Sequence, residues 1–255
     1  MNVQVVVIHL NQKAPKKGSM GLGKMNYFLV IASFFIINSG LHALAQPIEQ
    51  IGDIETRVVA ICAGKPDTDN ILGTGFIIEK SGLVVTADHV IFDEQKERVH
   101  RNLFCSWPTY PKPLWFRLSI NKRFNQGAKG RDIALLQIDS GNRLRSFPFL
   151  EIGDDFEIGD PVLITGFPLV FDKIYHWPLF RRGIIASTRY KYRHSRVIVL
   201  DLPAVEGYSG SPVFNMRNKK VVGIIKGGSE QRKGADFSVA IVLKKKELLN
   251  WRIGQ

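Results

Sequence analysis

The sequence predicts an all-β protein built as two small β-barrels, and three observations lead there. Helical periodicity is almost absent before the C-terminus, and short runs rich in β-branched residues recur between turn-forming residues. Residues 139–155, which include Ser140-Gly141-Asn142 and Pro148, suit a linker between two halves of roughly 95 to 105 residues. Strands are expected at 57–63, 75–79, 83–86, 114–120, 133–138, 162–165, 183–189, 196–202, 211–214, 221–225 and 237–242.

The sequence also predicts a tight hairpin turn and a C-terminal helix. Lys80-Ser81-Gly82 separates two strand runs and predicts a tight hairpin, because Gly82 adopts the positive φ of such a turn without steric cost. Residues 243–253 place Leu248, Leu249 and Trp251 among basic residues. This spacing predicts a short amphipathic C-terminal helix packed on a barrel.

Composition and charge exclude several classes of protein. Of 255 residues, 45% are hydrophobic, and the 23 glycines and 12 prolines follow no period, which argues against a disordered, collagen-like or coiled-coil chain. The net charge is +12, and removing the four lysines that precede residue 46 leaves +8. The basic residues are scattered and match no zinc-finger, RRM or helix-turn-helix pattern, so no specific nucleic-acid partner is expected.

The N-terminal residues are typical of an export signal. Residues 27–37 are apolar except for Ser33, and Ala43-Leu44-Ala45 supplies a cleavage site of the A-x-A kind, with cleavage expected after Ala45. The apolar run is shorter than the roughly 18 residues that cross a bilayer, so we expect no permanent span, with an uncleaved signal anchor as the alternative. The predicted location is periplasmic or secreted.

Two cysteines, Cys62 and Cys105, are the only ones in the chain. An oxidising compartment permits a disulfide between them, and both also suit small buried residues in strands, so the sequence leaves the two interpretations open. Two cysteines with no histidine at ligand spacing do not make a zinc site. We expect no metal and no other cofactor.

Three segments carry reactive residue types in fixed local frames. His89 lies in T-A-D-H-V, Asp132 lies in R-D-I-A-L-L, and Ser209 lies in G-Y-S-G-S-P. Together they supply what acyl transfer needs: a nucleophile, a base that takes its proton, and a carboxylate that orients the base. Without Cβ atoms at Gly207 and Gly210 the chain turns tightly, so the N–H groups of Gly207 and Ser209 are expected to form an oxyanion hole.

These segments and their neighbours resemble the trypsin-like serine proteases of chymotrypsin fold, closest to the bacterial Deg/HtrA-type protease domain without PDZ domains. The resemblance covers nearly all of residues 55–250. It implies two six-stranded antiparallel β-barrels with the active site between them, the base at His89, the orienting acid at Asp132 and the nucleophile at Ser209. The matching motifs are G-T-G-F at 73–76, V-V-T-A-D-H-V at 84–90, R-D-I-A-L-L-Q-I at 131–138, L-E-I-G-D at 150–154, G-D-P-V-L-I-T-G-F-P at 159–168 and G-Y-S-G-S-P-V-F at 207–214.

The same resemblance suggests which residues surround the substrate. Pro203 stands at the pocket floor, where an Asp would select Lys or Arg, and Gly227 and Gly228 leave the pocket mouth open. Lys226 takes a place often held by a small polar residue, and Asp236 is expected on the pocket wall or facing solvent. We expect a preference for medium-sized aliphatic residues before the cleaved bond.

Some residues depart from the family's pattern. Asp88 replaces a small apolar residue beside the base, and its charge is expected to favour the protonated imidazole if the two groups are close. Ser211 stands where the family usually has Gly, and Tyr208 replaces the Asp that pairs with a newly cut N-terminus in digestive enzymes. The chain ends about where the second barrel's closing helix ends, so no PDZ regulation is expected.

The sequence therefore predicts an exported serine endopeptidase that acts on protein or peptide substrates through an acyl-enzyme. The alternative is a catalytically inactive protease-like binding or adaptor protein of the cell envelope. The expected organisation is an N-terminal extension and signal peptide at 1–45, a first barrel at 46–145 with His89 and Asp132, and a second barrel at 146–255 with Ser209 and the C-terminal helix. The oligomeric state is left open.

Overall fold

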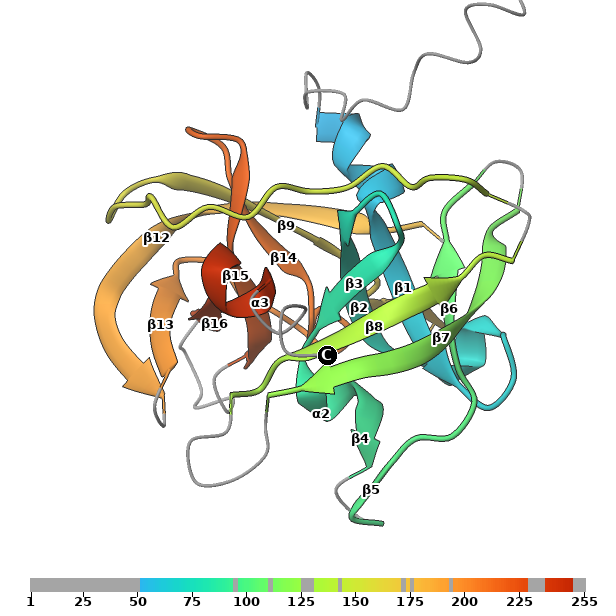
Figure 1. The fold of residues 1–255 in the computed structure, drawn as a ribbon. Helices are drawn as coiled ribbons and strands as arrows, with labels where there is room; N and C mark the ends of the chain where they lie inside the picture. The colour runs from blue at the N-terminus through green and yellow to red at the C-terminus, as the bar shows by residue number, and fades with distance from the viewer. Residues whose placement is uncertain are drawn as a thin grey trace, which may run out of the picture. The chain divides into compact units, whose positions relative to one another are not determined.

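Two closed barrels, each of six antiparallel strands, make up most of the described chain (Figure 1). The structure is a computed structural model. Both barrels belong to one compact unit. They confirm the expected all-β class with two six-stranded barrels and a short C-terminal helix. The described residues are 51–93, 96–109, 112–124, 131–141, 144–170, 173–174, 177–192, 195–228 and 237–249.

The first barrel closes in the strand order β1-β2-β3-β8-β7-β6. Its central strands are rich in Val, Ile and Leu, which favour extended backbone because their side chains pack well on a pleated, buried surface. A small hairpin, β4 (Phe92–Asp93) with β5 (Arg98–Val99), extends from it. The six barrel strands are β1 (Val58–Ala63), β2 (Ile71–Glu79), β3 (Leu83–Thr86), β6 (Leu103–Trp107), β7 (Leu114–Arg123) and β8 (Ala134–Asp139).

The second barrel closes in the order β12-β13-β16-β15-β14-β9. Its strands are β9 (Pro161–Gly166), β12 (Leu179–Tyr192), β13 (Ser195–Leu200), β14 (Pro212–Asn215), β15 (Lys220–Gly228) and β16 (Ser238–Val242). The remaining elements are the hairpin of β10 (Leu169–Val170) with β11 (Lys173–Ile174), the short helices α2 (Asp88–Ile91) and α3 (Lys245–Leu249), and the 3-10 turns η1 (Ile51–Arg57) and η2 (Thr68–Asn70).

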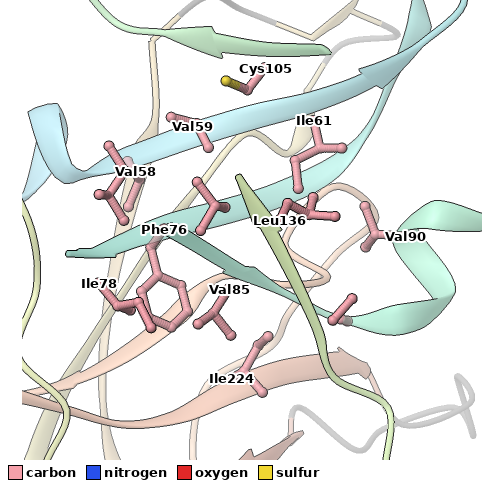
Figure 2. Close-up of a cluster of buried hydrophobic side chains, with 14 of the residues drawn as sticks. Val58, Val59, Ile61, Phe76, Ile78, Val85, Val90, Cys105, Leu136 and Ile224 are labelled. Carbon is pink, nitrogen blue, oxygen red and sulfur yellow. The ribbon is translucent and has the colours of Figure 1, made fainter. Parts of the chain in front are cut away.

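One hydrophobic cluster joins the two barrels. Figure 2 shows Phe76, Val85 and Leu136 of the first barrel beside Ile224 of β15, and all four side chains are fully buried. Burial of such side chains supplies the main driving force for folding, at about 1.5–3 kcal/mol each. Because the cluster is shared, the faces of the two barrels that meet there are stabilised together.

Residues 103–107, which form β6, correct the strand prediction. Prolines at 108, 111 and 113 follow this segment and argue against a strand nearby, yet Phe104 and Trp107 lie on β6 and pair with β7. Proline does not donate to a strand ladder, and Pro108 and Pro113 fall in the connection between the two strands. The pattern therefore gave eleven barrel strands where the structure has twelve.

The connection between the barrels packs on the first barrel. Gly82, at the tip of the predicted hairpin, has φ +85°, and the Phe147 N–H donates to the Lys80 carbonyl beside it. The Phe147 ring lies edge-on to Trp107 at 5.5 Å between centroids. The predicted domain boundary at 145/146 thus falls within a segment that the aromatic contacts hold in place.

Residues 1–45, the expected signal peptide, lie outside the described residues. Among the residues that are described, no helix is long and apolar enough to cross a bilayer.

Thr74, on β2, links the first barrel to the second by hydrogen bonds. Its N–H donates to the Ser209 carbonyl at 2.9 Å, and its hydroxyl donates to the Gly207 carbonyl at 2.8 Å while accepting the Phe167 N–H at 3.0 Å. The Thr86 hydroxyl in turn donates to the Thr74 carbonyl at 2.7 Å. Thr74 is completely buried, so these hydrogen bonds replace the water that its polar atoms would otherwise need.

Both cysteines are buried in neighbouring strands, and they form no disulfide with each other. Cys105 pairs with Ile61 across the β1–β6 ladder, so Cys62 is one position out of register with it. Adjacent strand positions point to opposite faces, which separates the two side chains. Burial, the largest cause, raises the pKa of the Cys62 thiol to about 11.

The thiols should therefore resist alkylation in the folded protein. The thiolate is the reactive form, and the Cys62 thiol, with its pKa raised to about 11, is almost wholly protonated at pH 8. Cys105 is fully buried and so is shielded from the reagent. We expect iodoacetamide to modify both cysteines rapidly in guanidinium and very slowly without it, as followed by intact mass. Rapid modification of the native protein, or an oxidised pair resistant to alkylation until reduced, would contradict the free-thiol arrangement.

Replacement of Thr74 by valine should loosen the contact between the barrels. The variant keeps the shape but leaves the buried Gly207 carbonyl and Phe167 N–H without the hydroxyl. We expect a loss of about 2–4 kcal/mol in the free energy of unfolding, measured by urea titration. Thr74→Ser retains the hydroxyl and should lose much less. Equal stability of the two variants would show that the hydroxyl does not hold the barrels together.

Candidate active site

His89 is presented by a single helical turn that follows a buried strand. β3 ends at Thr86, Ala87 continues in extended backbone with φ −73° and ψ 141°, and α2 begins at Asp88. The neighbours Asp88 and Val90 are buried, whereas the side chain of His89 is 32% exposed. The buried side chains of Asp88 and Val90 therefore hold the helical turn in place, while the imidazole of His89 stays accessible to solvent.

Asp132 holds the His89 backbone and ring together. One carboxylate oxygen accepts the His89 N–H at 2.9 Å, and the other lies 2.7 Å from Nδ1. With Asp132 ionised, Nδ1 is assigned as the donor, which leaves Nε2 free to accept a proton. The two contacts therefore fix the orientation of the imidazole ring relative to Asp132.

Backbone hydrogen bonds attach the segment that carries Asp132 to Phe124, the residue that follows β7. The Phe124 N–H donates to the Ile133 carbonyl, and the Arg131 N–H donates back to the Phe124 carbonyl. Burial of Asp132 favours its neutral form, but the hydrogen bonds and charge of His89, with a further contribution from the charge of Lys226, lower its pKa below the ordinary value. The carboxylate is therefore ionised at neutral pH.

Ser209 lies in a turn whose glycines are required for two reasons. Gly207 and Gly210 have φ of +91° and +85°, a region that side chains disfavour. A Cβ at Gly207 would overlap the Phe167 carbonyl oxygen, and one at Gly210 would overlap the Thr74 carbonyl oxygen. The turn can thus approach β2 and the end of β9 only because both positions lack side chains.

The turn is fixed from both sides. Thr74 donates to the Ser209 carbonyl, while the Gly210 N–H donates to the Ile225 carbonyl on β15 at 2.8 Å. The Ser209 side chain is left half-exposed, and its hydroxyl makes no hydrogen bond to any described residue. Among the described residues, the N–H groups of Gly207 and Ser209 likewise have no backbone or side-chain acceptor. These are the two donors that the sequence assigned to an oxyanion hole.

Asp88 does not act as a free charge beside His89. It is completely buried, and Arg123 at the end of β7 binds both of its oxygens at 2.5 and 2.6 Å. The Arg123 guanidinium also lies over the Phe92 ring at 4.5 Å. The expected effect of Asp88 on the imidazole is therefore opposed by a paired cation that the sequence analysis missed, because the two residues are separated by 35 positions.

The residues that the sequence places around the substrate pocket do not all lie next to Ser209 in the structure. The Pro203 carbonyl accepts a hydrogen bond from Arg181 at 2.9 Å. Gly227 lies beside the turn of Ser209, since a Cβ built on it would be 3.9 Å from Ser209 Oγ, and Gly228 ends β15 opposite Ser238. Lys226 lies on β15 with its ammonium over the Tyr192 ring. Asp236 lies outside the described residues.

Ser211 is accommodated by a glycine on the facing strand. Its hydroxyl is buried without a hydrogen-bond partner among the described residues. A Cβ on Gly166 would overlap that hydroxyl and lie 2.7 Å from Thr74 Oγ1. The serine that replaces the family's usual glycine thus occupies space left by another glycine.

No cluster of His, Cys, Asp or Glu with the arrangement of a metal site occurs among the described residues. The arrangement that the described residues do provide is an Asp–His pair, a serine hydroxyl in a glycine turn, and two amide donors beside it. These are the groups used in metal-independent acyl transfer.

Part of the chain is similar in sequence to curated bacterial proteins. The chain is 30% identical over 158 residues to a probable periplasmic serine endoprotease DegP-like of Pseudomonas putida, and 33% identical over 168 residues to one of Rickettsia conorii. Each match covers 60% of this chain and 28% of the relative. The chain therefore spans little more than a quarter of the length of these proteins.

Solved structures agree on the fold. The MamO protease domain of Magnetospirillum magneticum matches with a TM-score of 0.59 and 17% identity, over 80% of this chain and 98% of that one. A serine endoprotease of Yersinia pestis matches with a TM-score of 0.55 and 20% identity, over 79% of this chain and 64% of that one. A family model described as the trypsin-like peptidase domain matches residues 73–224, which contain His89, Asp132 and Ser209. The chain belongs to the trypsin-like peptidase domain family.

Proposed function

We propose that this protein is a serine endopeptidase with Ser209 as nucleophile, His89 as general base and Asp132 as the carboxylate that orients the base. The observation that carries the proposal is the double hydrogen bond from the His89 backbone and ring to one buried carboxylate. A general base needs a tautomer in which one ring nitrogen can take a proton, and the contact of Nδ1 with Asp132 provides it. The half-exposed imidazole and hydroxyl keep both groups open to a substrate.

In the proposed reaction the Ser209 hydroxyl oxygen attacks the carbonyl carbon of the scissile peptide bond. His89 Nε2 takes the hydroxyl proton and later gives it to the leaving amine, which departs and leaves an acyl-enzyme. Water, deprotonated by the same nitrogen, then releases the acid and restores the serine. The N–H groups of Gly207 and Ser209 stabilise the negative oxygen of each tetrahedral intermediate, a contribution of about 2.7–4 kcal/mol per donor.

The substrate backbone would bind along the end of β15. This strand continues to Gly228, whereas its pairing with β14 reaches only Ile224. The next residue, Ile225, is hydrogen-bonded to the turn of Ser209. From Lys226 to Gly228 no described residue pairs with this edge of the strand, so an extended peptide could add there and pass Ser209 beside Gly227. Pro203 brings no charge to the expected pocket floor, and the preference for aliphatic residues stays a prediction.

The proposed location is the periplasm or the exterior of the cell. The relatives from Pseudomonas putida and Rickettsia conorii are named as periplasmic proteins, and the N-terminal residues have the pattern of an export signal. The proposed substrates are proteins or peptides in that compartment.

A second candidate is a protease-like protein that binds peptides without cleaving them. One observation favours it: Ser209 Oγ and His89 are not hydrogen-bonded to each other in the described residues. Catalytic hydrogen bonds are often long before substrate binds, so this geometry is compatible with either function. The two are separated by the reactivity of Ser209.

Ser209 should react with a fluorophosphonate probe, and Ser209→Ala should abolish both labelling and peptide hydrolysis. The activated hydroxyl is the only group that the variant removes, so its unfolding curve should match that of the wild type. Mass spectrometry of the labelled peptide checks the site.

Ser211→Ala is the matched control, because Ser211 lies two residues away and its hydroxyl has no partner among the described residues. This variant should still be labelled. Labelling that survives in Ser209→Ala, or none in the wild type, would contradict the proposed peptidase and favour the binding protein.

Asp132→Asn should lower the labelling rate by about three to four orders of magnitude, because the amide favours the wrong imidazole tautomer. Its effect on stability should depend on pH. The folded pKa of Asp132 lies below its ordinary value, so the ionised group stabilises the fold above the unfolded pKa of about 3.9. This stabilisation is lost as pH falls through the folded pKa.

Urea unfolding of wild type and Asp132→Asn between pH 7 and 3 therefore tests the second part of this prediction. The stability gap should be largest near neutrality and should narrow on acidification. A gap that is constant or widens would show that Asp132 is not stabilised in its charged form.

A further inference from the structure

Arg123, the last residue of β7, binds the first residue of the helical turn that carries His89. Its Nε lies 2.5 Å from one carboxylate oxygen of Asp88, and its Nη2 lies 2.6 Å from the other. Asp88 is completely buried, and only 16% of the Arg123 side chain is exposed. Two parallel hydrogen bonds from a planar guanidinium fix direction as well as distance, so this contact defines where Asp88 lies.

The same guanidinium also contacts the other end of the turn. α2 ends at Ile91, and the ring centre of the next residue, Phe92, lies 4.5 Å from the Arg123 guanidinium. A cation over an aromatic face is stabilised electrostatically. One side chain therefore binds the residues at both ends of a short segment, and His89 lies between them.

The turn depends on contacts with the rest of the barrel because it is short. α2 has four residues, and Ala87 before it offers no side chain that could cap its first N–H groups. A single helical turn is unstable by itself, since nucleation fixes several residues for one hydrogen bond. Val90 and Ile91 pack in the core, but hydrophobic contacts are not directional. The contacts of Arg123 add the direction that packing lacks.

The end of β7 also holds the segment of Asp132. Arg123 pairs with Ala134 in the β7–β8 ladder, and the next residue, Phe124, donates its N–H to the Ile133 carbonyl at 2.9 Å. The backbone at this strand end thus binds the residues after Asp132, while the Arg123 side chain binds α2. The proposed acid and base are therefore attached to the same place in the barrel.

We propose that Arg123 is a positioning residue that sets the orientation of the His89 imidazole relative to Asp132. The inference rests on the proposed peptidase function, in which the imidazole must meet the Ser209 hydroxyl. A simpler role would be that Arg123 only neutralises Asp88. Buried ion pairs are often replaced by apolar residues without loss of stability, so the simpler role predicts normal activity once both charges are removed. Positioning predicts the opposite.

The first test is the rate of fluorophosphonate labelling in Arg123→Lys. Lysine keeps the positive charge, but it has no planar group that could bind both carboxylate oxygens and stack on the Phe92 ring. We expect the labelling rate to fall by about tenfold to a hundredfold, because small displacements of a catalytic group have effects of that size. A wild-type rate in Arg123→Lys would overturn the proposal.

Arg217→Lys is the matched control. Arg217 also binds both oxygens of a buried carboxylate, with its Nε and Nη2 at 2.9 and 3.1 Å from those of Asp160, and Asp160 lies next to β9 of the second barrel. This variant should be labelled at the wild-type rate. An equal fall in the two lysine variants would contradict positioning by Arg123, because the loss would then come from general destabilisation.

The double variant Asp88→Ala/Arg123→Met tests the simpler role directly. It should fold, because removing both partners leaves neither charge unpaired. Labelling is measured where urea titration shows that the variant is folded. We expect a rate at least about tenfold below that of the wild type, since the directional contact is gone. A wild-type rate would show that Arg123 serves only to neutralise Asp88.

NMR of the resting protein separates this proposal from the proposed function. In the Ser209→Ala background, ¹⁵N-labelled histidine shows which ring nitrogen of His89 carries the proton, with its signals assigned by their loss in His89→Asn. The Nδ1–H tautomer should dominate when the ring is neutral, and Arg123→Lys should raise the share of the Nε2–H tautomer. Unchanged tautomer shares would contradict the role of Arg123. Changed shares without any labelling of the wild-type protein would contradict only the peptidase.

Discussion

The hydrogen bonds of Thr74 are the constraint on which the site depends. The proposed base and acid lie on the first barrel and the proposed nucleophile lies on the second, so their geometry is only as definite as the contact between barrels. Thr74 uses its amide and its hydroxyl to bind the carbonyls of Ser209 and Gly207. The two glycines let the turn come close enough for this contact. The backbone and side chain of one buried residue thus fix the turn of Ser209 to strand β2.

The features that the sequence predicted correctly depend on residues that are neighbours in the chain. The hairpin at Gly82 and the glycine turn around Ser209 follow from conformations that one residue type adopts easily, and both have the expected positive φ. What it missed depends on distant partners. Strand β6 was hidden by nearby prolines and is defined by its pairing with β1 and β7, and the Asp88–Arg123 pair joins residues 35 positions apart. Motif spacing contains no information on such contacts.

The charged residues next to His89 and Asp132 in sequence, Asp88 and Arg131, each bind a partner of opposite charge. An unpaired buried carboxylate would be costly, and Asp88 avoids this cost by binding Arg123 through both oxygens. Arg131 joins the segment of Asp132 to the C-terminal helix α3 through Glu247 and to the end of β16 through the Val242 carbonyl at 2.9 Å. The C-terminal helix, attached to the second barrel in sequence, therefore also supports the acid of the first barrel.

The contact between Gly166 and Ser211 limits the order in which amino-acid substitutions can be accepted at these two positions. The serine hydroxyl fills the space of a Cβ at Gly166, so an alanine there is blocked while the serine remains. Loss of the hydroxyl would remove the closest obstacle, although Thr74 Oγ1 would still lie 2.7 Å away. The two positions, 45 residues apart in sequence, are therefore energetically coupled: an alanine at Gly166 should cost more stability when the Ser211 hydroxyl is present than when it is absent.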